Sequence, residues 1–161
     1  LSSGSTYEGA LCIYNNSPLT PLLTVPITLQ IPAPQIDVLP TGVTAMQLPD
    51  LQGTRVVTLS NGGNGTLTTT VTEGSSDCSE ISDLPWLAAT PITGTLLPGT
   101  ELPLTVQLDS TGLSSGSTHE GALCIYNNTL LTPILSVPVT LQVPWAYTLN
   151  LPLVLRDYSE P

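Results

Sequence analysis

The chain has 161 residues, a formal net charge of −10, a sequence pI near 4.1 and no lysine or phenylalanine. So acidic a surface repels phosphate backbones, which excludes nucleic acid as a partner class. The apolar fraction of 40% and the charged fraction of 9% exclude a disordered chain. No uncharged apolar run is long enough to span a membrane. Residues 1–5 lack a Met and an export signal, which indicates a processed product or a piece of something longer.

The first element in chain order belongs to an internal repeat. Residues 1–32 and 113–144 are identical at 25 of 32 positions, at an offset of 112 residues. Self-similarity at a fixed period is the signature of a tandem array. We therefore predict that residues 1–32 form the last two strands of an incomplete preceding unit. Residues 33–144 would then be one complete unit of about 112 residues, and residues 145–161 a strand-forming tail.

The complete unit is predicted to consist of short β-strands separated by turns. Apolar and β-branched runs alternate with turn sequences such as Asn61-Gly62-Gly63-Asn64-Gly65, and no helical periodicity is sustained. The predicted strands cover residues 36–39, 43–48, 55–59, 67–72, 86–90, 102–108, 119–126 and 134–143. Short strands at this spacing predict an all-β fold, an immunoglobulin-like antiparallel β-sandwich.

Residues 134–143 alternate between an apolar face and a more polar one, and they include a proline, which is unusual inside a strand. One face carries Leu135, Val137, Val139, Leu141 and Val143. Pro138, on the other face, has no N–H for a ladder and predicts an edge strand or a bulge. The matching strands within residues 7–31 would form a bare hairpin, which is not stable alone in water. We expect the front of its own unit or a neighbouring molecule to cover it.

Four motifs give the unit a family resemblance: Asn61-Gly62-Gly63, Leu84-Pro85-Trp86-Leu87, Gly94-Thr95-Leu96-Leu97-Pro98-Gly99 and Gly121-Ala122-Leu123-Cys124-Ile125. Through them the unit resembles the Ig-like modules of bacterial secreted proteins, of the BACON and ASPM/SPD-2/Hydin types. The resemblance implies a repeated, non-catalytic, extracellular module, and many such modules lie C-terminal to subtilisin-like proteases. Residues 147–156 are similar to the "YLPLVLR" endings of secreted proteins of filamentous bacteria, which implies a sorting or anchoring signal.

Three cysteines bear on the compartment. Cys12 and Cys124 occupy equivalent positions of the repeat, and Cys78 lies in an irregular segment. One disulfide per unit predicts a Cys78–Cys124 bond, with Cys12 bonded to a partner upstream of the chain. Such bonds imply an oxidising compartment outside the cytoplasm. Three buried thiols are the alternative, and a metal site is disfavoured because there is no CxxC motif or His cluster.

The titratable residues do not form a recognisable catalytic set. His119 is the sole histidine, and the other copy of the repeat has Tyr7 in its place, which argues against a catalytic base. We therefore expect an exposed strand residue, no enzyme activity and no cofactor. Asp77, Glu80 and Asp83 offer oxygen ligands for Ca²⁺, but a solvated acidic loop is favoured because the spacing matches no recognised site.

Aromatic and asparagine residues suggest two kinds of surface site. Trp86 lies among apolar residues and is predicted to pack in the core, whereas Trp145, at the junction with the tail, is predicted to be exposed. An exposed Trp makes cell-surface glycans a candidate partner. Asn15, Asn64 and Asn127 each begin an N-x-Ser/Thr triplet and are candidate glycosylation sites.

The tail completes the functional prediction. Its alternation places five apolar residues on one face, which predicts a strand able to join the sheet of another subunit: Tyr147, Leu149, Leu151, Leu153 and Leu155. Head-to-tail contacts of that kind build fibres. We predict a non-enzymatic spacer, stalk or fibre subunit, extracellular or on the bacterial cell surface, whose partners are further copies or neighbouring repeats. The alternatives are the accessory C-terminal region of a secreted subtilisin-like protease and a carbohydrate-binding module.

Overall fold

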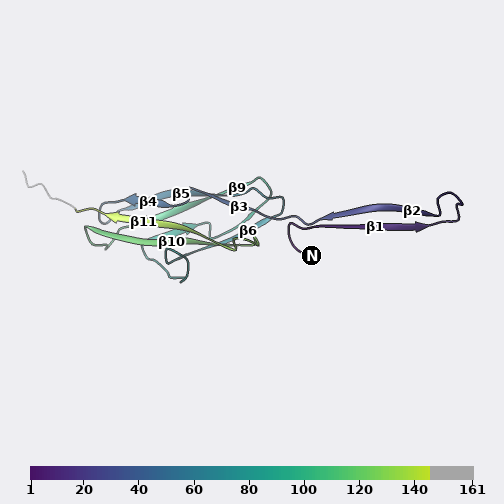
Figure 1. The fold of residues 1–161 in the computed structure, drawn as a ribbon. Coiled ribbons are helices and arrows are strands. Elements are labelled where there is room, and N and C mark those ends of the chain that lie inside the picture. Colours follow the sequence, from purple (N-terminus) through teal and green to yellow (C-terminus); the bar gives the residue numbers. More distant parts are fainter. Residues whose placement is uncertain (146–161) are drawn as a thin grey trace, which may run out of the picture.

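The computed structural model describes residues 1–145, which form a β-hairpin and a β-sandwich. The hairpin projects from one end of the sandwich (Figure 1). The hairpin strands are β1 (Thr6–Tyr14) and β2 (Leu22–Gln30). The sandwich strands are β3 (Ile36–Leu39), β4 (Val43–Met46), β5 (Gln52–Asn61), β6 (Leu67–Gly74), β7 (Leu87–Thr90), β8 (Thr93–Leu96), β9 (Glu101–Asp109), β10 (Ser117–Asn127) and β11 (Ile134–Val143). The described part of the chain has no helix long and apolar enough to cross a membrane.

Two sheets make up the sandwich. One has five strands in the order β4-β11-β10-β6-β8, and the other has four in the order β3-β5-β9-β7. The pairings are antiparallel except that of β11 with β4, which is parallel. The immunoglobulin-like sandwich predicted from the strand spacing is therefore confirmed.

The core lies between the two sheets and is built from alternate residues of each strand, as the period-two pattern of a half-buried strand requires. Leu59 and Leu104 from one sheet and Leu123 and Ile125 from the other are completely buried. Burying each such side chain stabilises the fold by roughly 1.5–3 kcal/mol. Trp86 is also buried in this cluster, as predicted from its apolar neighbours.

The structure differs from the sequence prediction in β8 and in the position of β11. No strand was predicted at Thr93–Leu96, which pairs with β6. Pro138 predicted an edge strand or a bulge at that point; β11 as a whole is not an edge strand, because it lies between β10 and β4, but at Pro138 it pairs with β10 alone. Pro138 is accommodated because the ladder with β4 begins at the next residue, Val139.

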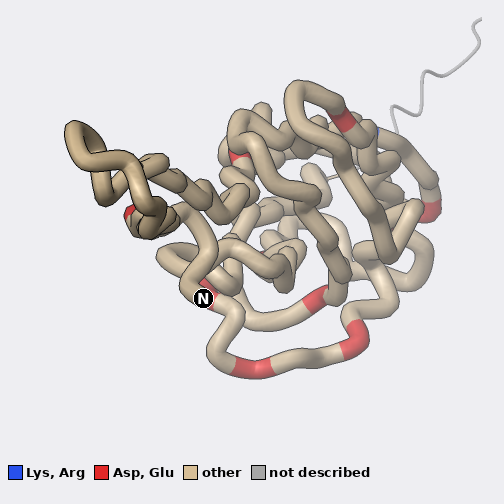
Figure 2. Tube along the Cα trace, turned by 90° about the vertical axis from the view of Figure 1, so that its right-hand side faces the viewer, with Lys and Arg blue, Asp and Glu red and all other residues tan. Residues whose placement is uncertain are grey.

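Acidic residues are scattered over the hairpin and the sandwich, with almost no basic residues among them (Figure 2). Arg55 is the one Arg or Lys among residues 1–145, and its guanidinium donates to the carbonyl of Thr54. Attractive ion pairs therefore contribute little to this fold. Its stability comes from the apolar core, the strand ladders and one covalent bond described below.

Candidate functional site: an open strand pair and its junction

The hairpin β1–β2 repeats the pairing of β10–β11 inside the sandwich. Leu11 is opposite Val25 in the hairpin, as Leu123 is opposite Val137 in the sandwich. The same offset of 112 relates every pair of the two ladders from Thr6–Gln30 onward. Since a slip of one residue would turn every side chain to the other face, the shared register gives both strand pairs the same apolar face.

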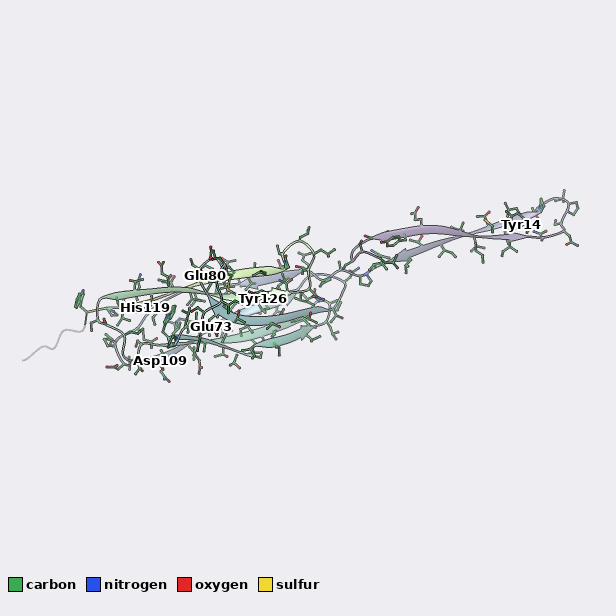
Figure 3. All side chains as sticks on the ribbon, turned by 90° about the horizontal axis from the view of Figure 1, so that it is seen from below. Tyr14, Glu73, Glu80, Asp109, His119 and Tyr126 are labelled. Carbon is green, nitrogen blue, oxygen red and sulfur yellow. A yellow bond between two sulfur atoms is a disulfide. The ribbon has the colours of Figure 1, made fainter. Side chains whose placement is uncertain are left out.

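The surroundings of this shared face differ completely. Leu123 and Val137 are 0% exposed, whereas Leu11 and Val25 are 53% and 41% exposed. We call the uncovered surface the open face; it consists of Tyr7, Leu11, Ile13, Leu23, Val25, Ile27 and Leu29, all exposed. Tyr14 lies toward the far end of the hairpin, whereas its counterpart Tyr126 lies within the sandwich (Figure 3). Large exposed apolar surfaces on folded proteins are typical of interaction sites.

The edges of the hairpin are open as well. In the sandwich, β10 also pairs with β6, and β11 also pairs with β4. Within residues 1–145, β1 and β2 pair only with each other. Both outer edges therefore present backbone N–H and C=O groups without ladder partners, which favours the addition of further strands.

The other face of the repeat carries the cysteines. Cys124 is bonded to Cys78 in a disulfide with a Cα–Cα distance of 5.6 Å, the pairing predicted from the sequence. The bond holds the irregular segment after β6 against the outer face of β10, where Cys78 packs with Ala122 and Tyr126. Cys12 occupies the position equivalent to Cys124, but it is a free and exposed thiol.

Residues 31–35 connect the hairpin to the sandwich, and hydrogen bonds fix their first part to the hairpin. The N–H of Ile31 donates to the carbonyl of Ser5 at 2.9 Å, and the carbonyl of Ile31 accepts from the N–H of Gly4 at 3.0 Å. The base of the hairpin is thus closed up to the residue that precedes Pro32.

The turn Asn61–Gly65 binds the second part of this linker. The N–H of Ala33 donates to Asn64 Oδ1 at 2.8 Å, and the carbonyl of Ala33 accepts from the N–H groups of Asn64 and Gly65 at 3.0 and 2.9 Å. Asn61 Oδ1 accepts from the N–H of Gln35 at 3.2 Å. Asn61 itself is buried, and its amide nitrogen donates to the carbonyl of Gly65 at 2.8 Å, which fixes the turn.

Two glycines of this turn are required by the close approach of the linker. A Cβ on Gly63 would lie 2.3 Å from the carbonyl oxygen of Ala33, and one on Gly65 would lie 2.9 Å from its carbonyl carbon. Between Ile31, held by the hairpin, and Ala33, held by the turn, stands Pro32, whose ring fixes φ. The junction therefore has little rotational freedom. The sequence indicated a turn at Asn61–Gly65 but did not indicate that it binds the linker.

His119 does not have the arrangement of a general base. Its Nε2 lies 2.8 Å from Ser117 Oγ, but that hydroxyl donates its hydrogen to the carbonyl of Ser114 at 2.6 Å. The histidine N–H must then donate to Ser117, which is the reverse of what activation of a nucleophile needs. His119 is half-buried rather than exposed as expected, with its ring 6.0 Å from that of Trp86.

The acidic segment does not form a metal centre in the structure. Asp77, Glu80 and Asp83 are exposed, and no cluster of metal-ligating side chains occurs within residues 1–145. Asp77 instead accepts hydrogen bonds from the hydroxyls of Ser79 and Ser75 at 2.7 and 2.8 Å. These bonds favour the charged carboxylate and lower the pKa of Asp77 to about 2.

Two of the candidate glycosylation sites close hairpin loops. Asn127 Nδ2 donates to the carbonyl of Thr132 at 2.8 Å, and Asn15 Nδ2 donates to the carbonyl of Thr20 at the same distance. A glycan on either nitrogen would disturb this bond. Asn64 is exposed, and its Oδ1 holds the linker as described above. Glycosylation of the three residues stays a prediction.

The remaining predicted residues are Trp145 and those of the tail. Trp145 is 67% exposed and lies against Gly116 at the end of the sandwich. The predicted inter-subunit strand lies outside the described residues: Tyr147, Leu149, Leu151, Leu153 and Leu155.

Comparison by sequence finds no matching family model and no matching curated protein. By structure, the chain resembles PapD-like domain 7 of human CEP192, with 13% identity, a TM-score of 0.57 and coverage of 71% of this chain and 89% of that one. It also resembles a chain of the CsuC–CsuE chaperone–tip adhesion subunit complex of Acinetobacter baumannii, with 14% identity, a TM-score of 0.54 and coverage of 68% of this chain and 52% of that one. A third likeness is to a Porphyromonas gingivalis W83 protein of unknown function, with 17% identity, a TM-score of 0.56 and coverage of 87% of this chain and 66% of that one.

This chain spans about half of the Acinetobacter chain and about two thirds of the Porphyromonas protein. The likenesses define the class of the fold, a PapD-like or Ig-like β-sandwich. At identities of 13–17% they extend to the fold alone. The site that the geometry defines is a strand pair with an open apolar face, held by a rigid junction to a complete sandwich.

Proposed function

We propose that this chain is a non-enzymatic structural segment of an extracellular bacterial protein built from tandem sandwich units. Its role is that of a spacer, stalk or fibre component. The observation that carries the proposal is the strand pair outside the sandwich, which repeats the last strand pair inside it in sequence and in register. Residues 1–32 are then the end of one unit, residues 33–144 the next unit and residues 145–161 the tail.

The junction supports a mechanical role. A spacer needs a fixed orientation between neighbouring units, and the linker is bonded to the hairpin through Ile31 and to the sandwich through Ala33. Flexible linkers, by contrast, are rich in Gly and Ser, whereas residues 31–35 contain neither and include two prolines. The rigid connection is therefore what a stalk requires.

Two further observations support the location and the class of partner. The Cys78–Cys124 disulfide is typical of proteins in oxidising compartments outside the cytoplasm. The resemblance to BACON-type secreted modules points to the same compartment. One structural neighbour is named as part of a complex between a chaperone and a tip adhesion subunit, which favours protein partners for a fold of this kind.

The test of this proposal is the location of the parent protein. Antibodies raised against the full chain are applied to intact source cells and imaged by immunogold electron microscopy. We expect label on the outer surface, on appendages or on secreted material. Label confined to the cytoplasm of sectioned cells contradicts the proposal.

Assembly through the tail is a separate part of the proposal. The alternating apolar residues of the tail are those of a strand that joins the sheet of another subunit. Deletion of residues 147–161 is then expected to abolish assembly of the parent protein into polymers. Polymers of unchanged length and number would contradict this role of the tail.

A further inference from the structure

We infer that the open face of β1–β2 binds the front of another sandwich unit of this type, equivalent to residues 33–112, and that Cys12 forms a disulfide with the loop cysteine of that unit. The inference rests on the proposed tandem arrangement and names the partner within it. The same contact is present inside the sandwich. There β10–β11, which has the same sequence pattern and register as β1–β2, is covered by residues 33–112.

The apolar side chains that would meet the partner are nearly the same in the two copies. In the sandwich, Leu123 and Ile125 pack in one core cluster with Leu104 and Val106 of the facing sheet. Leu11 and Ile13 are the identical residues of the open face. The open face and its counterpart differ elsewhere by one methylene, Ile27 for Val139, and by the pair Tyr7 and His119. Ile27 adds one methylene to the partner's core, to which the neighbouring side chains would have to adjust, and the position of Tyr7 is only half-buried where His119 occupies it in the sandwich.

The open edges of the hairpin fit the same partner. A unit front supplies one strand equivalent to β6, which pairs with β10 from Ala122 to Asn127. It also supplies one equivalent to β4, which pairs with β11 from Val139 to Gln142. Both bare edges of β1–β2 would thereby gain the ladder partners that they lack within residues 1–145. Packing two hairpins of identical chains face to face would leave these edges open, so a second copy is the poorer partner.

The cysteine provides an independent observation. Cys124 is completely buried and bonded to Cys78 of the front, whereas Cys12 at the equivalent position is free and exposed. A front equivalent to residues 33–112 brings a cysteine to the same place. With glutathione disulfide as the oxidant, the two thiols form one protein disulfide and two glutathione molecules are released, so that electrons and protons balance.

The test supplies the missing front from the chain itself. A second copy of residues 33–112 is placed before Leu1, so that its final glycine precedes Leu1 as Gly112 precedes Leu113, which gives a two-unit chain. The protein is oxidised in a glutathione redox buffer. We expect Cys12 to become inaccessible to a maleimide and to be found by peptide mapping in a disulfide with the added copy of Cys78. We expect the β1–β2 amides to exchange at least about 100-fold more slowly than in the original chain.

Two controls separate the contact from the bond and from misfolding. With Cys78→Ser in the added copy alone, Cys12 should stay a thiol while the slow amide exchange persists. In the matched control, residues 33–144 are duplicated ahead of residues 33–161, so that the first unit ends in its own strand pair. If this control folds and protects that strand pair while β1–β2 in the two-unit chain exchanges as fast as in the original chain, the inference is wrong.

A second copy as the true partner has its own signature. The original chain would then be a dimer by sedimentation, with its β1–β2 amides already protected, and that result overturns the inference. None of these outcomes depends on where the parent protein is located. Failure here would leave the immunogold result standing, and an intracellular location would leave the strand contact standing.

Discussion

Leu11 and Leu123 occupy the same position in the two copies of the repeat. Replacing each of them by alanine measures how much its burial contributes to the free energy of unfolding. Leu123 is 0% exposed between the sheets, whereas Leu11, with the same neighbours in sequence, is 53% exposed. Truncating a fully buried leucine removes its transfer free energy and leaves a cavity, at a cost of about 3 kcal/mol. Leu11 is packed mainly by its own hairpin, so we expect Leu11→Ala to cost less than about 1 kcal/mol.

The assay is urea unfolding followed by tryptophan fluorescence, in which Trp86, 7% exposed in the core, reports on the sandwich and Trp145 is already 67% exposed in the folded chain. With a urea m-value of about 2 kcal/mol/M, Leu123→Ala should lower the midpoint by roughly 1.5 M and Leu11→Ala by less than about 0.5 M. In the two-unit chain, the cost of Leu11→Ala should rise to that of Leu123→Ala. Equal losses from the two substitutions in the original chain would refute the reasoning, because they would mean that the open face is already covered.

Three further predictions concern the sandwich and its junction. Replacing Cys78 and Cys124 by alanine opens a loop with a sequence separation of 46, and chain entropy gives a loss of about 4 kcal/mol in urea unfolding; a loss below about 1 kcal/mol would contradict it. Asn64→Ala should speed amide exchange at the linker. Asn128→Ala, which removes two hydrogen bonds at the same end of the sandwich, should not. Equal effects of the two substitutions would contradict the role of the turn in holding the linker. Asp77, whose pKa is lowered to about 2, should stay charged in NMR titrations until well below pH 3.8. Its contribution to folding should be lost as the pH falls through about 2. A titration midpoint near 3.8 would contradict the hydrogen bonds that Ser75 and Ser79 donate to its carboxylate.

Much of the sandwich follows from its sequence because each strand carries a period-two pattern. Residues 134–143 are an example, since the face predicted to be apolar contains Val137, Val139 and Leu141, all of which are buried. The predicted faces hold because a half-buried strand has only two ways to orient its side chains. The boundaries were less accurate, as with the strand predicted at residues 55–59 that extends over Gln52–Asn61.

The elements that the sequence did not indicate depend on non-local contacts. The strand Thr93–Leu96 has few apolar residues, and it forms by pairing with β6, in which Leu67 lies opposite Leu96 and Thr70 opposite Thr93. Whether Pro138 falls inside or outside the ladder with β4 depends on where β4 begins to pair, and that ladder begins at Val139.

For the candidate site, the repeat alone predicted a hairpin that needs a covering partner, because a sandwich cannot be built from two strands. It did not predict the linker contact, which joins Ala33 to Asn64 across 31 positions of sequence.

The turn that binds the linker has a geometric consequence for a long array. When every step from one unit to the next applies the same rotation and translation, repeated steps generate a screw. The pitch and handedness of that screw would be set by the Ala33 contact with Asn64 and Gly65 and by the fixed φ of Pro32. A few backbone hydrogen bonds at one junction would thus specify the shape of an object many times longer than the unit itself.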